Sequence, residues 1–139
     1  MLHRILLLIG LTALIAGCGG GGGTPTNQPP EVTDLEVEPP QVAFVGGNVT
    51  ITAQATDDNA VATVTAKVTG AGGTATVNLT LSGGQYGGTY AAEQNLETED
   101  SVYTVTVTAT DNQDLESTEV TAQFAVRGLS APPGPPEGF

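Results

Sequence analysis

The side chains that most often do chemistry in proteins are scarce in this chain. There is one cysteine, Cys18, and one histidine, His3, and both lie near the amino terminus. Cys18 follows Ile15, Ala16 and Gly17, so the single thiol comes directly after an aliphatic residue and two small ones. In an exported protein, a single unmodified thiol would remain a reactive group, because it has no second cysteine in the chain to pair with. This spacing makes Cys18 the first candidate for a covalent modification.

The first 17 residues have the anatomy of a cleaved leader. A cationic start with Arg4 precedes an apolar run over residues 5–16, which is shorter than the roughly 20 residues that a membrane-spanning helix needs. The leader resembles a bacterial lipoprotein signal peptide, whose lipobox pattern matches residues 15–18. The resemblance implies cleavage before Cys18, a diacylglyceryl thioether on its sulfur, and usually a further acyl chain such as palmitate on the new amino terminus.

Lipidation predicts a location in the bacterial cell envelope, with the membrane as a partner through the lipid on Cys18. Gly19 occupies the position where an aspartate commonly retains lipoproteins in the inner membrane of two-membrane bacteria. A glycine at this position, in place of an aspartate, favours the outer membrane if the organism has one. The alternatives are an uncleaved anchor, or an ordinary secretory leader followed by an incidental cysteine.

The segments on either side of the central part of the chain are rich in glycine and proline. Residues 18–30 hold a five-glycine run and then Pro29 and Pro30, which predicts a flexible tether with a reach of roughly 20 Å. Residues 128–139 are rich in proline and predict a disordered tail in polyproline-like conformation. The alternative for the tail is recognition by an aromatic groove of a partner.

The charge of the chain disfavours several classes of partner. The formal net charge is −12, and beyond the leader only Lys67 and Arg127 oppose 15 acidic residues. Such a field repels nucleic acid, so no nucleic-acid partner is expected, and anionic lipid surfaces are equally poor partners. Divalent cations and basic protein surfaces stay open as partners, and the acidity can also serve solubility alone.

The composition beyond the leader disfavours an enzyme. The mature chain has no histidine and no free thiol, so His-based triads, Cys nucleophiles and ordinary zinc sites are all excluded. A pair of carboxylates can in principle hydrolyse a glycoside. However, a domain of about 100 residues rarely holds both a sandwich core and an enclosed sugar cleft. We therefore expect no catalytic site.

Between residues 32 and 126 the sequence alternates with period two and is dense in Val, Thr and Ala, which is typical of half-buried strands. We expect an all-β fold, a single antiparallel sandwich of seven or eight strands over residues 31–127. Pro39 and Pro40 interrupt the first strand, which indicates an edge strand that changes sheets. The side chains expected to face the core are Val32, Leu35, Val37, Val49, Ile51, Ala53, Ala55, Ala62, Val64, Ala66, Val68, Ala75, Val77, Leu79, Leu81, Tyr86, Tyr90, Tyr103, Val105, Val107, Ala109, Val120, Ala122, Phe124 and Val126.

The run over residues 103–111, with Leu96 upstream, resembles the sixth strand of immunoglobulin-like, fibronectin type III-like and cadherin-like bacterial modules. The resemblance implies an immunoglobulin-like sandwich and a tyrosine corner at Tyr103. It also implies a non-enzymatic binding or adhesion module of unknown ligand, with an envelope protein or a polysaccharide as the possible partner. The alternative is a structural spacer or an accessory subunit of an envelope complex.

Two polar turns carry the remaining candidate ligands, namely Asp57, Asp58 and Asn59 in one turn and Asp111 and Asp114 in the other. In the resembling folds both turns lie at the same end of the sandwich. Calcium takes six to eight hard oxygen ligands, often from such loops, and cadherin-like modules use comparable ones. Asp and Asn are also ordinary turn residues, because their side chains bond their own backbone. The choice is between a structural calcium site and no cofactor.

Overall fold

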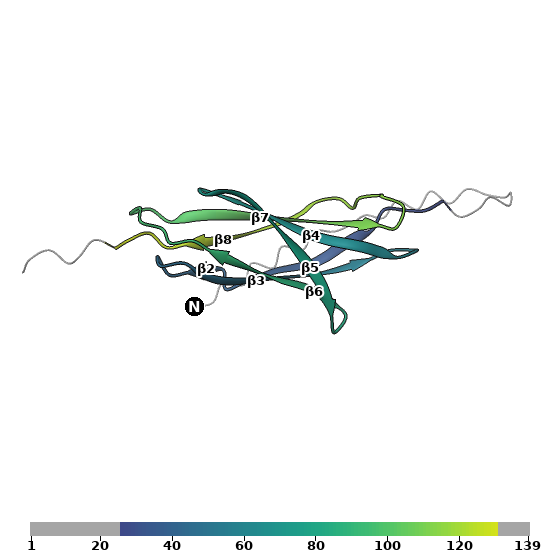
Figure 1. Ribbon diagram of the computed structural model, residues 1–139, viewed down its shortest axis with the longest axis horizontal. Helices are drawn as coiled ribbons and strands as arrows, with labels where there is room; N and C mark the ends of the chain where they lie inside the picture. Colours follow the sequence, from purple (N-terminus) through teal and green to yellow (C-terminus); the bar gives the residue numbers. More distant parts are fainter. Residues whose placement is uncertain (1–25, 131–139) are drawn as a thin grey trace, which may run out of the picture.

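The computed structural model describes residues 26–130, which form eight strands and, within that range, no helix. The strands lie in two layers that face each other (Figure 1). This confirms the predicted all-β fold of seven or eight strands. The strand bounds are β1 Glu31–Glu38, β2 Gln41–Val42, β3 Gly47–Thr56, β4 Val61–Gly70, β5 Gly73–Ser82, β6 Gln85–Ala92, β7 Ser101–Asp111 and β8 Val120–Val126.

Several of the sequence-based predictions fall on residues outside this range. The leader, Cys18, residues 19–25 of the tether and residues 131–139 of the tail lie outside the described residues. In the described part of the chain, no helix is long and apolar enough to cross a membrane.

The strands pair into two sheets. Sheet A contains β1, β3 and β6, and sheet B contains β5, β4, β7, β8 and β2 in spatial order. All pairs are antiparallel except the short pair of β2 with β8, where Gln41 is opposite Ala125. The expectation of a wholly antiparallel sandwich is corrected at this one pair, because β2 continues in the direction of β1 and β8 runs the same way.

The two sheets are joined at both edges by segments that change layer. At one edge, β1 pairs with β3 in sheet A, and after Pro39 and Pro40 the chain resumes as β2 in sheet B. Proline has no N–H to donate, so the ladder must stop there, and the predicted edge strand that changes sheets is confirmed. At the other edge, residues 73–79 of β5 pair with β4, whereas residues 80–82 pair with β6.

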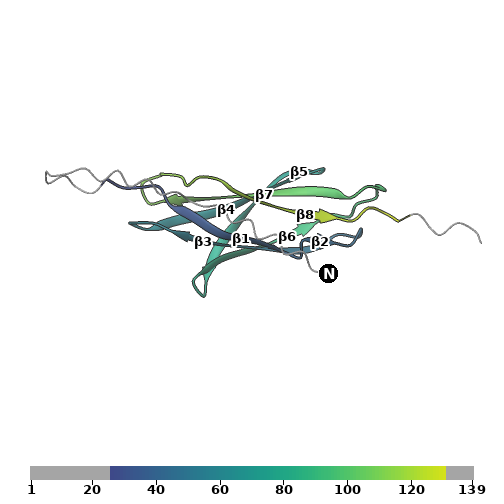
Figure 2. The ribbon, with the colours of Figure 1, turned by 180° about the vertical axis from the view of Figure 1, so that it is seen from behind.

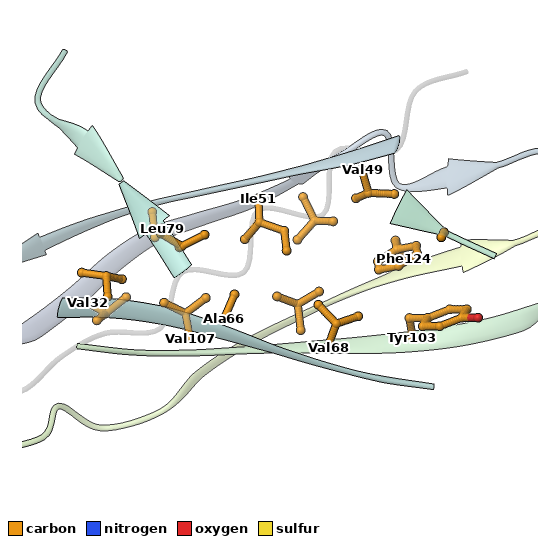
Figure 3. Close-up of a cluster of buried hydrophobic side chains, with 14 of the residues drawn as sticks. Val32, Val49, Ile51, Ala66, Val68, Leu79, Tyr103, Val107 and Phe124 are labelled. Carbon is orange, nitrogen blue, oxygen red and sulfur yellow. The ribbon is translucent and has the colours of Figure 1, made fainter. Parts of the chain in front are cut away.

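The core lies between the sheets and is made mostly of valine. Figure 3 shows Val49 and Ile51 on one layer pointing toward Val68 and Val107 on the other. At one end of the core, Phe124 and Tyr103 stack with centroids 4.9 Å apart and an interplanar angle of 7°. The inward alternation predicted for β3, β7 and β8 is confirmed, since its members there are buried or packed against the core.

Tyr103 is held differently from a tyrosine corner. Its hydroxyl makes no hydrogen bond to the described residues, and its ring lies directly over the backbone of Gly70. A Cβ atom at Gly70 would come within 2.3 Å of the ring. Tyr90 tilts against both Tyr103 and Phe124, with centroid distances of 6.1 and 6.0 Å. Aromatic packing, rather than a hydroxyl bond, therefore positions this side chain.

Three predicted inward residues are instead exposed. Ala75 and Leu81 on β5 face solvent, because β5 is an edge strand whose last residues leave sheet B and pair with β6. Ala62 is exposed because a β-bulge shifts the register between Val61 and Thr63 and so changes the alternation.

The chain enters and leaves the sandwich at opposite ends, as Figures 1 and 2 show. The end where β1 begins is called the proximal end and contains residues 26–30, 57–60 and 112–119. The end where β8 finishes is called the distal end and contains residues 43–46, 71–72, 93–100 and 127–130. Glu31 pairs with Thr56 at the proximal end, and Ser101 pairs with Val126 at the distal end.

Candidate functional site

The structure brings the predicted acidic turns together at the proximal end, and a residue from the tether joins them. Val61, just after the first turn, pairs with Asp111. The side chain of Asn27 donates a hydrogen bond from Nδ2 to Asp111 Oδ2 and accepts one at 3.5 Å from Asn59 Nδ2. The N–H of Gln28 also donates to Asp58 Oδ1 at 3.5 Å. Sequence reasoning missed Asn27, because its partners lie 32 and 84 residues away.

Asp57 shapes its own turn. Its Oδ2 accepts the N–H groups of Asn59 at 3.0 Å and of Ala60 at 2.9 Å, which is the self-capping arrangement typical of aspartate in turns. Its other oxygen, Oδ1, is buried and has no hydrogen-bond partner among the described residues. Asp114, in the second turn, adopts a left-handed backbone with φ of 64°. Asp114 is exposed, and its role there is conformational.

Asp111 is the buried centre of the proximal end, with 1% of its surface exposed. Its Oδ1 accepts the N–H groups of Gln113 at 2.7 Å and Leu115 at 2.9 Å, and Asn27 bonds the other oxygen. Burial alone would raise the pKa of this carboxyl. The hydrogen bonds from Leu115, Asn27 and Gln113 outweigh burial and lower the pKa below its ordinary value. Asp111 is therefore a charged structural anchor.

These contacts use the carboxylates for internal bonds. Among residues 26–130, no three or more His, Cys, Asp or Glu side chains are grouped so that they could hold a metal ion. Calcium at Asp57, Asp58, Asn59, Asp111 and Asp114 stays a prediction. Thermal unfolding with calcium and then with a chelator tests it, and an unchanged midpoint would remove the calcium hypothesis.

At the distal end the organising residue is Asn95, which is 5% exposed. Its side-chain amide donates to the carbonyls of Glu99 at 2.7 Å and Val126 at 3.2 Å, and its Oδ1 accepts the N–H of Glu97 at 3.1 Å. Its own N–H donates to the carbonyl of Phe44 at 2.7 Å. One side chain thus ties the long loop between β6 and β7 to β8. The sequence carries no signal for this role.

Next to Asn95 the distal end has an open hollow of about 680 Å³. Its lining includes Val45, Leu96, Glu93, Glu97 and the ring of Tyr103. Val45 and Leu96 are 63% and 65% exposed, which is high for apolar side chains. Apolar groups that gather on a surface in this way often mark a contact with another macromolecule.

A second open hollow, of about 480 Å³, lies on the outer face of sheet A. It is lined by hydroxyl and amide side chains and by two glycines, without a carboxylate or a cation. Its lining residues are Thr50, Thr52, Thr80, Ser82, Gln85, Tyr86, Gly87, Gly88 and Thr89. The described residues contain no histidine or cysteine, so neither hollow offers an imidazole base or a thiol nucleophile.

Comparison with known proteins supports the fold. No family model matches the chain, and no curated protein sequence does so either. Among solved structures, fibronectin(III)-like modules of CbhA from Clostridium thermocellum match with a TM-score of 0.50 and 22% identity, over 72% of this chain and 47% of theirs. An engineered protein matches with a TM-score of 0.45 and 21% identity, over 73% of this chain and 20% of its own.

The chain thus spans about half the length of the first of these structures and a fifth of the second. At 22% identity the likeness to the modules concerns the fold. Their similarity, together with the two packed sheets, shows that residues 26–130 form an all-β domain of the immunoglobulin-like and fibronectin III-like kind.

Proposed function

We propose that this chain is a lipid-anchored, non-enzymatic lipoprotein of the bacterial cell envelope that presents its sandwich as a binding or adhesion module. The observation that carries the proposal is that the chain enters and leaves the sandwich at opposite ends. The chain enters at the proximal end through residues 26–30 and leaves at the distal end through residues 127–130. An anchor on Cys18 would therefore hold the proximal end near the membrane and direct the distal end outward.

The dimensions of the domain suit this role. Strand β7 has 11 residues, and at about 3.4 Å per residue it spans roughly 35 Å. The contacts of Asn27 and Gln28 bind the end of the tether to the proximal loops. The free linker would then run from Cys18 to Asn27, with a reach of roughly 17 Å for a glycine-rich chain. The domain would therefore lie close to the membrane, held by a short linker.

The anchor is tested by the Cys18→Ala variant of the full chain, with Thr24→Ala in the tether as the matched control. We expect the unchanged protein and Thr24→Ala to fractionate with membranes and to incorporate labelled palmitate. Cys18→Ala should lose both the label and firm attachment. If Cys18→Ala stays bound equally firmly after its leader has been removed, the lipid-anchor proposal is wrong.

A second candidate function is that of an accessory subunit or spacer in an envelope complex. The exposed Val45 and Leu96 beside the distal hollow favour it, because a partner subunit would cover them. Cross-linking in intact cells, with unchanged protein and with the double variant Val45→Ser/Leu96→Ser, separates the two functions. Loss of a discrete cross-linked complex in the variant supports the accessory subunit, and an identical pattern speaks against it.

A further inference from the structure

The strands of sheet B carry no exposed carboxylate, although the domain as a whole is dense in them. Strands β2, β4, β5, β7 and β8 contain one acidic residue, Asp111, which is buried at the end of β7. Edge strand β1 alone contains four, and the other acidic residues of the described chain lie in loops. Both cations of the described range, Lys67 on β4 and Arg127 after β8, lie on sheet B or at its rim.

The outward positions of sheet B are mostly threonines in register. On β4, Val64, Ala66 and Val68 are buried, so the residues that alternate with them point outward. Paired residues on neighbouring strands share a face, and outward positions repeat at about 6.8 Å along a strand and about 4.8 Å between strands. The threonines of this outer face are Thr63, Thr65, Thr69, Thr74, Thr76, Thr104, Thr106, Thr108, Thr110 and Thr121.

Four of the ten threonine hydroxyls on this face contact one another in two pairs. Thr65 Oγ1 lies 3.4 Å from Thr108 Oγ1, and Thr69 Oγ1 lies 3.1 Å from Thr74 Oγ1, each across a strand pair. Threonine is branched at Cβ and has few rotamers on a strand. Each hydroxyl can donate one hydrogen bond and accept two. The face is therefore a regular array of partly pre-ordered donors and acceptors, interleaved with methyl groups.

The chemistry of the array selects among partners. The hot spots of protein–protein interfaces are rich in aromatic residues and arginine. On the outer face of sheet B the large exposed apolar side chain is instead Val102, at the distal end of β7. A ligand made of uncharged hydroxyl groups brings no charge of its own that must lose water, and its oxygens can accept a hydrogen bond from Lys67, which lies among the threonines in register with Thr76 and Thr106. It also avoids the carboxylates of the loops at both ends of the face.

From these observations we infer that the outer face of sheet B binds a neutral polysaccharide lying across β4 and β7. The inference rests on the proposed binding function and names its ligand class. Each hydroxyl contact exchanges a bond to water and is weak by itself. A polymer that presents the same groups repeatedly makes many such contacts, and several anchored copies of the module would strengthen the attachment further.

The test uses the full chain, purified in detergent, mixed with insoluble cellulose, chitin or β-1,3-glucan, and with alginate beads as the anionic control. We expect retention on at least one neutral polymer and none on alginate. Thr65→Glu/Thr104→Glu places two carboxylates on the face and should reduce retention about tenfold or more. The matched control Thr52→Glu/Thr89→Glu adds the same charge to the outer face of sheet A and should stay within about twofold of the unchanged protein.

A second variant protects the result from a folding defect. Thr65→Val/Thr104→Val keeps the shape and the branched side chains but removes two hydroxyls, and should also lower retention, with an unchanged circular dichroism spectrum. The inference is overturned if the unchanged protein binds no neutral polymer, or if both glutamate variants lose binding equally. A dimer in analytical ultracentrifugation that Thr65→Glu/Thr104→Glu dissociates would assign the face to a second copy and also overturn it.

This assay is independent of the anchor. The protein is held in detergent, so retention on polysaccharide does not require attachment to a membrane. If the protein fails to bind polysaccharide, the result of the Cys18→Ala membrane fractionation is unaffected. If the fractionation fails to show a lipid anchor, the result of the polysaccharide assay is likewise unaffected.

Discussion

Replacing Asn95 should destabilise the distal end of the sandwich. The side chain makes three hydrogen bonds, to the carbonyls of Glu99 and Val126 and from the N–H of Glu97, and it is buried. A buried hydrogen bond contributes about 1 kcal/mol net, and partners left unpaired add to the loss. Asn95→Ala should therefore lower the free energy of unfolding by about 3 kcal/mol. For a domain of this size that corresponds to a drop in Tm of roughly 12–24 °C.

The assay is urea unfolding followed by far-ultraviolet circular dichroism, because the chain has no tryptophan. Gln94→Ala is the matched control, since its neighbouring amide side chain is exposed and makes no hydrogen bond in the described range. We expect the control to stay within about 0.5 kcal/mol of the unchanged protein. If Asn95→Ala unfolds at the same urea concentration as Gln94→Ala, the three bonds do not stabilise the fold and the reasoning is refuted.

Asn95→Asp sharpens the same test. At neutral pH it places a buried carboxylate against the carbonyls of Glu99 and Val126, which should cost more than the alanine. Burial and the facing acceptors would raise the folded-state pKa of this new carboxyl above its unfolded value. Its protonated form, favoured at low pH, donates one of the two lost bonds again, so the variant's loss of stability should be smallest near pH 4 and grow as the pH rises through the folded pKa. A deficit that does not change with pH would contradict this account.

Two further predictions concern the packing and the pH response of the domain. A Cβ at Gly88 would lie 2.8 Å from Leu79 Cδ2, whereas at the neighbouring Gly87 the nearest atom is 3.6 Å away. In urea unfolding, Gly88→Ala should thus lower the free energy of unfolding by about 1–3 kcal/mol, while Gly87→Ala should change it little. Equal losses in the two variants would contradict the close packing of β5 on β6. The bonded Asp111 has a lowered pKa, so its stabilisation is present above the unfolded pKa near 3.9 and is lost as the pH falls through the folded value. Asp111→Asn should flatten the loss of stability below about pH 4, and an unchanged slope would show that another group controls acid unfolding.

Much of the fold was predictable from the local pattern. Alternation with period two identifies strands wherever one face is buried, and on β3 and β7 it located every buried apolar side chain, from Val49 to Ala109. It did not locate Asp111, which was expected in a turn and is buried at the end of β7. Pro39 and Pro40 marked the edge where the chain changes sheets, since a residue without an N–H ends a ladder whatever lies around it. These features depend on neighbours within a few residues.

The exceptions depend on pairing between distant segments. Ala75 and Leu81 alternate as regularly as their counterparts on β3, yet both are exposed because β5 leaves sheet B for β6. Nothing near Asn95 in the sequence indicates that it will meet Val126, and nothing near Asn27 indicates Asp111. In the candidate site, therefore, the acidic turns were predictable, but their use as internal anchors was not.

The sequence by itself determined which residues form strands, where prolines and glycines interrupt them, and that carboxylates are absent from the threonine-rich segments. These properties follow from backbone sterics and side-chain solvation, which act locally. Only the tertiary structure decided that those segments would share one outer face, that the acidic turns would be tied together by Asn27, and that the chain would enter and leave the sandwich at opposite ends. Such relations arise from long-range strand pairing, whose partners are selected by the packing of the whole core.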